Sequence, residues 1–139
     1  MIQPLLLDTC AALWFMNDDP HMKPAAVEAI DAAGVHGESI FVSPITALEV
    51  ATLARKGRFT FTLSPRLWFE RLLAAPGLCL AELPPHIFFE SQNLPGDIHG
   101  DPADRIIAAT AREYGYTVVT RDVRLLAYGE AGHIRALAC

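Results

Sequence analysis

Short apolar runs recur along this chain, and residues that start a helix follow each of them. The clearest runs are Leu5–Leu7, Ile40–Val42 and Thr117–Thr120. Runs of this length and composition are typical of strands that are buried on both faces of a sheet. Parallel strands need a crossover connection, usually a helix, between them. The alternation therefore predicts an α/β fold, a three-layer α/β/α sandwich with a central, mainly parallel sheet.

Caps, prolines and glycines mark where the helices begin and end. Ser43-Pro44, Ser64-Pro65 and Asp101-Pro102 each place a capping side chain before a proline at the first helical position. Gly34 is expected to close the second helix. The expected elements are strand Leu5–Leu7, helix Thr9–Asn17, helix 24–33, strand Ile40–Val42, helix 44–56, helix 66–75, strand 78–83, helix 85–92, helix Pro102–Tyr114, strand Thr117–Thr120, a helical turn at 122–128 and strand 133–138.

The composition fits one domain over residues 1–139. The chain is 52% hydrophobic with a mean hydropathy of +0.26, and we find no repeat or long linker. This leaves apolar surface for a partner as well as for a core. The three cysteines are far apart and form no CxxC pair, and no uncharged run approaches the length of a membrane span. The first residues lack the basic start of a signal peptide, so we expect a soluble, cytoplasmic protein.

The charge pattern limits how the chain could meet nucleic acid. A net charge of −5 argues against coating nucleic acid by bulk electrostatics. One stretch is nevertheless basic, and such a run is either a solvated face or a track for phosphates. Its members are Arg55, Lys56, Arg58, Arg66 and Arg71.

Four carboxylates border or interrupt strongly apolar sequence. Asp8 closes the first strand, Glu49 lies in an apolar helix, Asp104 precedes Ile106, and Asp122 follows the strand Thr117–Thr120. A carboxylate in such surroundings loses hydration unless a cation or hydrogen bonds replace the water. Ligands of open α/β sheets bind beyond the carboxyl ends of the strands. We therefore expect the four acids to meet at that edge.

Oxygen ligands without histidine or cysteine suit Mg²⁺ or Mn²⁺ rather than zinc, and such sites commonly carry out phosphoryl chemistry. Each acid also has a local explanation. Asp101 and Asp104 make a good helix start, Asp122 could cap the turn after its strand, and Glu49 could reach water from an exposed helix position. The combination, rather than any one acid, indicates a site.

In order and spacing, these pieces resemble the PIN-domain family, and VapC-type toxins in particular. The matching segments are 5–9, 42–50, 99–111 and 118–122, which cover nearly the whole chain. The most specific piece is the run His99-Gly100-Asp101-Pro102-Ala103-Asp104-Arg105. Many relatives carry an aromatic residue where this chain has Ala103, a position without a catalytic role.

The resemblance implies an endoribonuclease that depends on Mg²⁺ or Mn²⁺ and hydrolyses RNA with a metal-activated water, leaving a 5′-phosphate and a 3′-hydroxyl. The resemblance also implies the toxin component of a VapBC-like toxin–antitoxin pair. The resemblance assigns catalysis and metal binding to Asp8, Glu49, Asp104 and Asp122, with Thr120 and Asp101 in support.

The partners implied are the RNA substrate, a cognate antitoxin protein and a second copy in a homodimer, with DNA contacted only through the antitoxin and no membrane. Trp14, Phe15 and Met16, and the apolar residues of 67–73, could meet such partners or could belong to the core.

Three alternatives were weighed. A PIN-like module could be catalytically silent and act only through its partner complex, although such a module has no physical need for four mutually repelling acids. A haloacid-dehalogenase-like phosphatase needs a second aspartate where this chain has Cys10. A response-regulator receiver needs a late lysine, and the only lysines are Lys23 and Lys56.

Overall fold

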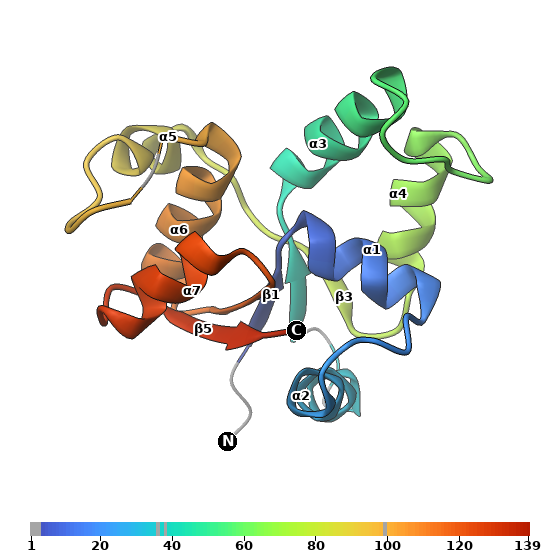
Figure 1. Ribbon diagram of the computed structural model, residues 1–139, viewed down its shortest axis with the longest axis horizontal. Coiled ribbons are helices and arrows are strands. Elements are labelled where there is room, and N and C mark those ends of the chain that lie inside the picture. The colour runs from blue at the N-terminus through green and yellow to red at the C-terminus, as the bar shows by residue number, and fades with distance from the viewer. Residues whose placement is uncertain (1–3, 36, 38, 99) are drawn as a thin grey trace.

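The computed structural model describes residues 4–35, 37, 39–98 and 100–139 of the chain. A single five-stranded sheet lies at its centre (Figure 1), in the order β3-β2-β1-β4-β5. Every neighbouring pair of strands is parallel, and Leu6 of the central strand lies opposite Phe41 on one side and Val118 on the other. The strands are β1 (Leu5–Leu7), β2 (Ile40–Val42), β3 (Leu78–Leu80), β4 (Thr117–Thr120) and β5 (Arg135–Ala138).

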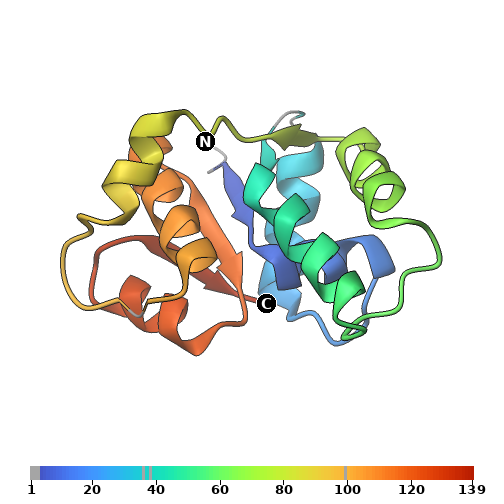
Figure 2. The same ribbon diagram turned by 90° about the horizontal axis from the view of Figure 1, so that it is seen from above.

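Helices connect the strands and cover both faces of the sheet, as Figure 2 shows on either side of β1. The helices are α1 (Thr9–Asn17), α2 (Pro24–Val35), α3 (Pro44–Arg55), α4 (Pro65–Ala74), α5 (Pro85–Ser91), α6 (Pro102–Tyr114) and α7 (Val123–Glu130). The three-layer α/β/α sandwich expected from the sequence is confirmed.

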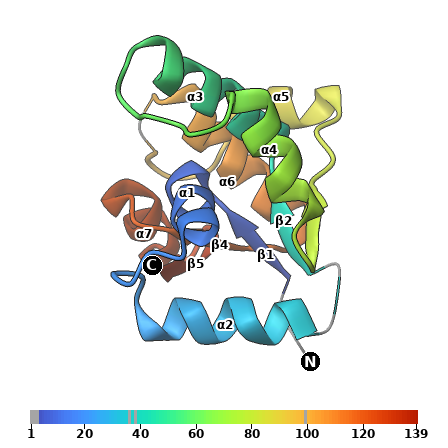
Figure 3. The ribbon, with the colours of Figure 1, turned by 90° about the vertical axis from the view of Figure 1, so that its right-hand side faces the viewer.

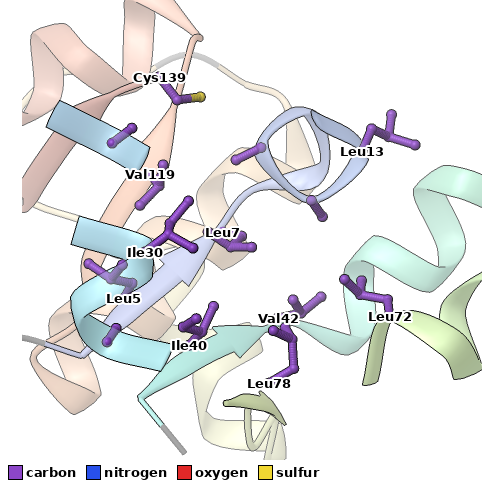
Figure 4. Close-up of a cluster of buried hydrophobic side chains, with 14 of the residues drawn as sticks. Leu5, Leu7, Leu13, Ile30, Ile40, Val42, Leu72, Leu78, Val119 and Cys139 are labelled. Atoms are coloured by element: carbon purple, nitrogen blue, oxygen red, sulfur yellow. The ribbon is translucent and has the colours of Figure 1, made fainter. Parts of the chain in front are cut away.

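Alternation along β1 divides the core into two layers. Leu5 and Leu7 point into the layer covered by α1 to α4, where Ile30 of α2 packs near them (Figure 4). Leu6 points into the opposite layer, formed with α6 and α7. Figure 3 shows α2 lying across the end of the sheet opposite the carboxyl end of β1. Both faces of β1 are thus buried, which explains why its sequence is continuously apolar.

The apolar residues near 67–73 divide between core and surface. Trp68 and Leu72 are buried in the first layer, so the core explanation holds for them. Leu67 is 41% exposed on the outer side of the same helix. The aromatic end of α1 is half-buried, and the Arg121 guanidinium lies 3.9 Å from the centre of the Trp14 ring.

Gly34 does not end the second helix, contrary to the sequence-based expectation. The helix continues to Val35, and Gly37 beyond it has a left-handed backbone, with φ of 65°. A Cβ on Gly77 would lie 3.0 Å from the Gly34 Cα. The missing side chain at Gly77 therefore allows the turn before β3 to pack closely on α2, and Gly34 lies inside the helix at that contact, where its own Cβ would meet only Ile40 Cδ1 at 3.9 Å.

Two strands are shorter than expected. The strand expected over 78–83 stops at Leu80, because its only partner, β2, ends where Ser43 caps α3. The strand expected over 133–138 begins at Arg135, since the His133 amide donates a hydrogen bond of 3.3 Å to the Tyr128 carbonyl at the end of α7. No helix among the described residues combines the length and apolar character needed to cross a membrane.

Candidate active site

The four acids singled out from the sequence line one cavity at the carboxyl end of β1 and β4. Figure 2 shows why they can meet there: β1 lies between α6 on one side and α1 and α3 on the other. Each of these helices, together with the turn into α7, brings a carboxylate to the cavity. The lining includes Asp8, Glu49, Asp104 and Asp122, joined by Asp101, Thr9, Cys10, Leu13, Leu53 and Arg121.

Asp8 is the most deeply buried of the acids, with 6% of its surface exposed. It caps α1, and its Oδ1 accepts a hydrogen bond of 2.8 Å from the Ala11 amide. Its Oδ2 accepts a hydrogen bond from the Thr120 hydroxyl. Burial raises the pKa of Asp8 to about 6 despite these two hydrogen bonds, and the charges of Glu49 and Asp122 add to the rise. A cation at this carboxylate would relieve that cost.

Glu49 reaches the cavity from the second turn of α3. The Thr9 hydroxyl donates to its Oε1, and Thr46 Oγ1 lies 3.3 Å from Thr9 Oγ1. Burial raises the pKa of Glu49 and the nearby charge of Asp101 raises it further, although the hydrogen bond from Thr9 opposes the rise. Thr9 thus joins the first residues of α1 to the face of α3 that carries Thr46 and Glu49.

Asp101 and Asp104 come from the start of α6 and differ in what they do there. Asp101 Oδ1 accepts from the amides of Ala103 and Asp104, so the helix-cap explanation holds for Asp101. Asp104 lines the cavity, and burial together with the charges of Asp101, Asp122, Glu49 and Asp8 raises its pKa to about 7. Because four neighbouring acids contribute to that rise, Asp104 lies at the centre of the acidic group.

The start of α6 is fixed by the loop that precedes it. The Arg105 Nε donates to the Ser91 carbonyl at 2.8 Å, and its Nη1 donates to the Ile98 carbonyl at 3.1 Å. The Tyr128 hydroxyl donates to the Pro95 carbonyl from the side of α7. These bonds hold both ends of the loop, and with it the position of the two acids on α6. His99, the first residue of the most specific sequence motif, lies outside the described residues.

Thr120 and Asp122 join the end of β4 to the same group. The Thr120 hydroxyl donates to Asp8 and accepts a hydrogen bond of 2.9 Å from the Asp122 amide. Asp122 caps α7, and its Oδ2 lies 3.3 Å from Arg124 Nη2. Burial works to raise the pKa of Asp122, but hydrogen bonds from Arg124 and Leu125 outweigh it and leave the pKa below the ordinary value. Capping and membership of the cavity are therefore compatible.

The chain matches a known protein family over most of its length. The family model of the PIN domain matches residues 5–131. The chain belongs to the PIN-domain family. It is similar to ribonuclease VapC22 of Mycobacterium tuberculosis, with 33% identity over 121 residues, which covers 87% of this chain and 88% of that protein.

Several solved structures share the fold of this PIN domain at low sequence identity. VapBC2 from Rickettsia felis, bound to a DNA fragment from its promoter, has a TM-score of 0.67 at 16% identity and covers 96% of this chain and 97% of that chain. DNA-bound VapBC from Salmonella typhimurium has a TM-score of 0.62 at 17% identity and covers 98% of each chain. FitAcB from Neisseria gonorrhoeae has a TM-score of 0.57 at 21% identity and covers 96% of each chain.

The donor atoms of this PIN domain suit a hard divalent cation. The acids offer carboxylate oxygens, and the Cys10 thiol stays protonated because burial, followed by the charge of Asp8, raises its pKa. Across the described residues, no three His, Cys, Asp or Glu side chains already form a closed metal cluster.

Thr9 and Arg121 are among the residues of the PIN-domain cavity that sequence reasoning did not identify. Thr9 could have been found, because it directly follows a strand-end acid and must therefore begin α1 beside it. Arg121 lines the cavity while its guanidinium lies over Trp14. That contact joins residues more than a hundred positions apart, and no local pattern indicates it.

Proposed function

We propose that this PIN domain is an endoribonuclease that uses Mg²⁺ or Mn²⁺ to hydrolyse RNA phosphodiester bonds. The observation that carries the proposal is the concentration of acids around Asp104, whose pKa lies near 7 because burial and four neighbouring acids oppose its ionisation. Such an arrangement is costly for a protein that needs only to fold. A bound divalent cation would neutralise the repulsion among these carboxylates, so the acidic group favours cation binding. The family and the similarity to a ribonuclease support this choice of chemistry.

Asp8, Glu49, Asp104 and Asp122 are the residues that we assign to hold the cation. A bound Mg²⁺ or Mn²⁺ supplies positive charge that stabilises the phosphate in the transition state and makes water more acidic. Thr120 holds Asp8 in place through its hydroxyl, and Thr9 does the same for Glu49. Asp101 fixes the first turn of α6 and thereby the position of Asp104. This network orients the carboxylates before the substrate binds.

Water attacks the phosphorus in line with the departing 3′-oxygen in the proposed reaction. The bond from phosphorus to the water oxygen forms as the bond to the 3′-oxygen breaks, and a proton passes to the departing oxygen. The products are a 5′-phosphate and a 3′-hydroxyl. A mechanism through the 2′-hydroxyl of RNA would instead leave a cyclic phosphate, so the product ends distinguish the two.

We further propose that the chain is the toxin of a toxin–antitoxin pair in the cytoplasm, inhibited by a cognate antitoxin and active as a homodimer. The relatives support this proposal, because VapBC2 and VapBC were each solved with promoter or other DNA bound. DNA contact by this chain would then occur through the antitoxin. Size-exclusion chromatography with light scattering tests the dimer: a monomer at micromolar concentration overturns that part.

Asp104→Asn tests the nuclease against a matched control, Asp97→Asn. Asp97 is exposed in the loop before α6 and does not line the cavity. We expect the wild-type protein and Asp97→Asn to cut total RNA with Mn²⁺ and to leave 5′-phosphates, while Asp104→Asn is at least a hundredfold slower with an unchanged circular dichroism spectrum. Equal cutting by Asp104→Asn contradicts the assigned site. Failure of the wild-type protein to cut any RNA supports the alternative, a silent module that acts through its partner.

A further inference from the structure

A groove runs from the acidic cavity along α3. One wall is α3, with Leu48, Thr52 and Leu53, and the other is the start of α6, with Pro102 and Ala103. Glu49, Leu53 and Asp101 line both the groove and the acidic cavity. The groove and the cavity are therefore neighbours with shared walls, and a chain bound at the acids can continue into the groove.

The two ends of the groove carry opposite charge. Glu49 and Asp101 lie at one end, while Lys56 and Arg58 line the other. Lys56 follows Glu49 by seven residues along α3 and the residue that caps it, a separation of about 10 Å at 1.5 Å per residue. That is roughly three nucleotides of a stacked strand at 3.4 Å per phosphate. A strand with its reacting phosphate at the acids would therefore present later phosphates to the basic end.

Both basic side chains are available for such a contact. Lys56 and Arg58 are exposed, and in the described part of the chain no carboxylate lies within ion-pair distance of either. The other members of the basic stretch differ in position. Arg66 and Arg71 lie on α4 and do not line this groove.

The walls of the groove also carry apolar side chains. Leu48 is 62% exposed although it is a large hydrophobic residue next to Glu49, and Pro102 and Ala103 face it across the groove. An exposed leucine alone needs no explanation. Here it lies beside Glu49 in the wall of the same groove, where the flat face of a nucleobase could pack on it.

We propose that this groove binds the RNA strand on one side of the cleaved phosphate, with Lys56 and Arg58 holding backbone phosphates and Leu48 packing against a base. The inference rests on the proposed nuclease function and adds to it the path of the substrate. Charge complementarity favours RNA as the occupant, because a polyanion needs a cation at the acidic end and positive side chains at the other. The overall charge of −5 makes these two free cations a local exception.

The test compares two double variants that remove the same charge. Lys56→Ala with Arg58→Ala alters the groove, and Arg66→Ala with Arg71→Ala alters α4. Binding of a fluorescein-labelled, single-stranded RNA 20-mer of mixed sequence is measured by anisotropy with Ca²⁺, and cleavage of total RNA is measured with Mn²⁺. We expect the groove pair to raise Kd and KM about tenfold with little change in kcat, and the α4 pair to change Kd less than twofold.

The salt dependence gives a readout that a structural defect would not reproduce. Each lost phosphate contact lowers the slope of log K against log salt by about 0.7 for a single strand, so the groove pair should lower it by about 1.4. Leu48→Ser should raise Kd about threefold without changing the slope. Its control, Phe89→Ser, alters a residue that is 73% exposed on α5 and should leave Kd unchanged.

Equal effects of the two double variants overturn the proposal, as does an unchanged Kd or a wild-type protein that does not bind the RNA probe. If the groove variants bind RNA normally but lose a co-expressed antitoxin, the groove is a protein site and the proposal is wrong. Cleavage by the wild-type protein is scored separately. If the wild-type protein cuts RNA and the groove pair has an unchanged Kd, the groove proposal is wrong and the nuclease proposal stands. If the wild-type protein cuts no RNA, the nuclease proposal is wrong.

Discussion

Asp8→Asn distinguishes two contributions of the Asp8 side chain to the free energy of unfolding. One is the destabilisation by its buried charge, and the other is the stabilisation by its hydrogen bonds. The pKa of Asp8 rises from 3.8 to about 6 on folding. At 1.36 kcal/mol per pKa unit, the ionised carboxylate lowers the free energy of unfolding by about 3 kcal/mol relative to its neutral form. Because the folded-state pKa is the higher one, the stabilising contribution of the protonated Asp8 is complete below about pH 4. It is lost as the pH rises through about 6 and the carboxyl group ionises.

The asparagine keeps only part of the hydrogen bonding. Its amide oxygen can still accept from the Ala11 amide, but its NH₂ group cannot accept from Thr120. Thr120 already accepts a hydrogen bond from the Asp122 amide, so its hydroxyl hydrogen would lose a partner, at a cost of about 1 kcal/mol. We expect Asp8→Asn to be less stable than the wild-type protein by about 1 kcal/mol near pH 4 and more stable by about 2 kcal/mol near pH 7.5.

Urea unfolding in EDTA at the two pH values measures this reversal. The free energy of unfolding of the wild-type protein is subtracted from that of the variant at each pH. The subtraction removes the pH dependence that comes from carboxylates present in both proteins. Adding Mg²⁺ at pH 7.5 should stabilise the wild-type protein by mass action and leave Asp8→Asn nearly unchanged. Asp97→Asn serves as the control, with changes below about 0.5 kcal/mol at both pH values. A stability difference for Asp8→Asn that is the same at pH 4 and pH 7.5 would refute the reasoning.

Three further predictions concern residues that support the site or the core. Thr120→Val should cost about 1–3 kcal/mol in urea unfolding and weaken Mn²⁺ binding measured by calorimetry, because it removes a donor and an acceptor together; Thr120→Ser should restore both. Gly77→Ala and Gly37→Ala both place a side chain at positive φ, but only the new Cβ at position 77 would lie 3.0 Å from the α2 backbone. Gly77→Ala should therefore lower the free energy of unfolding in urea more than Gly37→Ala does. Trp68→Ala should cost about 3–5 kcal/mol, because the ring is 6% exposed and packs edge-on against Phe61 at 5.7 Å; a loss below 1 kcal/mol would contradict its place in the core.

The strands and helix starts could be predicted because their signals are local. Leu5–Leu7 is apolar throughout since both faces of β1 are buried, and Ser43-Pro44 begins α3 where a cap and a proline predict a start. The meeting of Asp8 with Asp122 also followed, because parallel strands end at one edge of a sheet. These predictions needed only the periodicity of the sequence and a general rule of α/β folds.

Other features depend on contacts that the sequence does not encode locally. The close approach of Gly77 to the Gly34 backbone joins positions far apart in the chain, and the hydrogen bond from Thr9 to Glu49 joins two helices. The end of β3 is set by its neighbour β2 rather than by its own apolar residues. Whether the acids act as caps or as cavity walls was likewise undecidable from spacing, and the structure shows that Asp122 does both.

The central claim is that the acid-lined cavity hydrolyses RNA with a divalent cation. The most direct test is cleavage of total RNA by the purified protein with Mg²⁺ or Mn²⁺, against the same reaction in EDTA, beside Asp8→Asn in the same buffers. We predict cutting that requires the cation, leaves 5′-phosphates and is lost in the variant. Cutting that persists in EDTA, or that Asp8→Asn retains in full, would contradict the account.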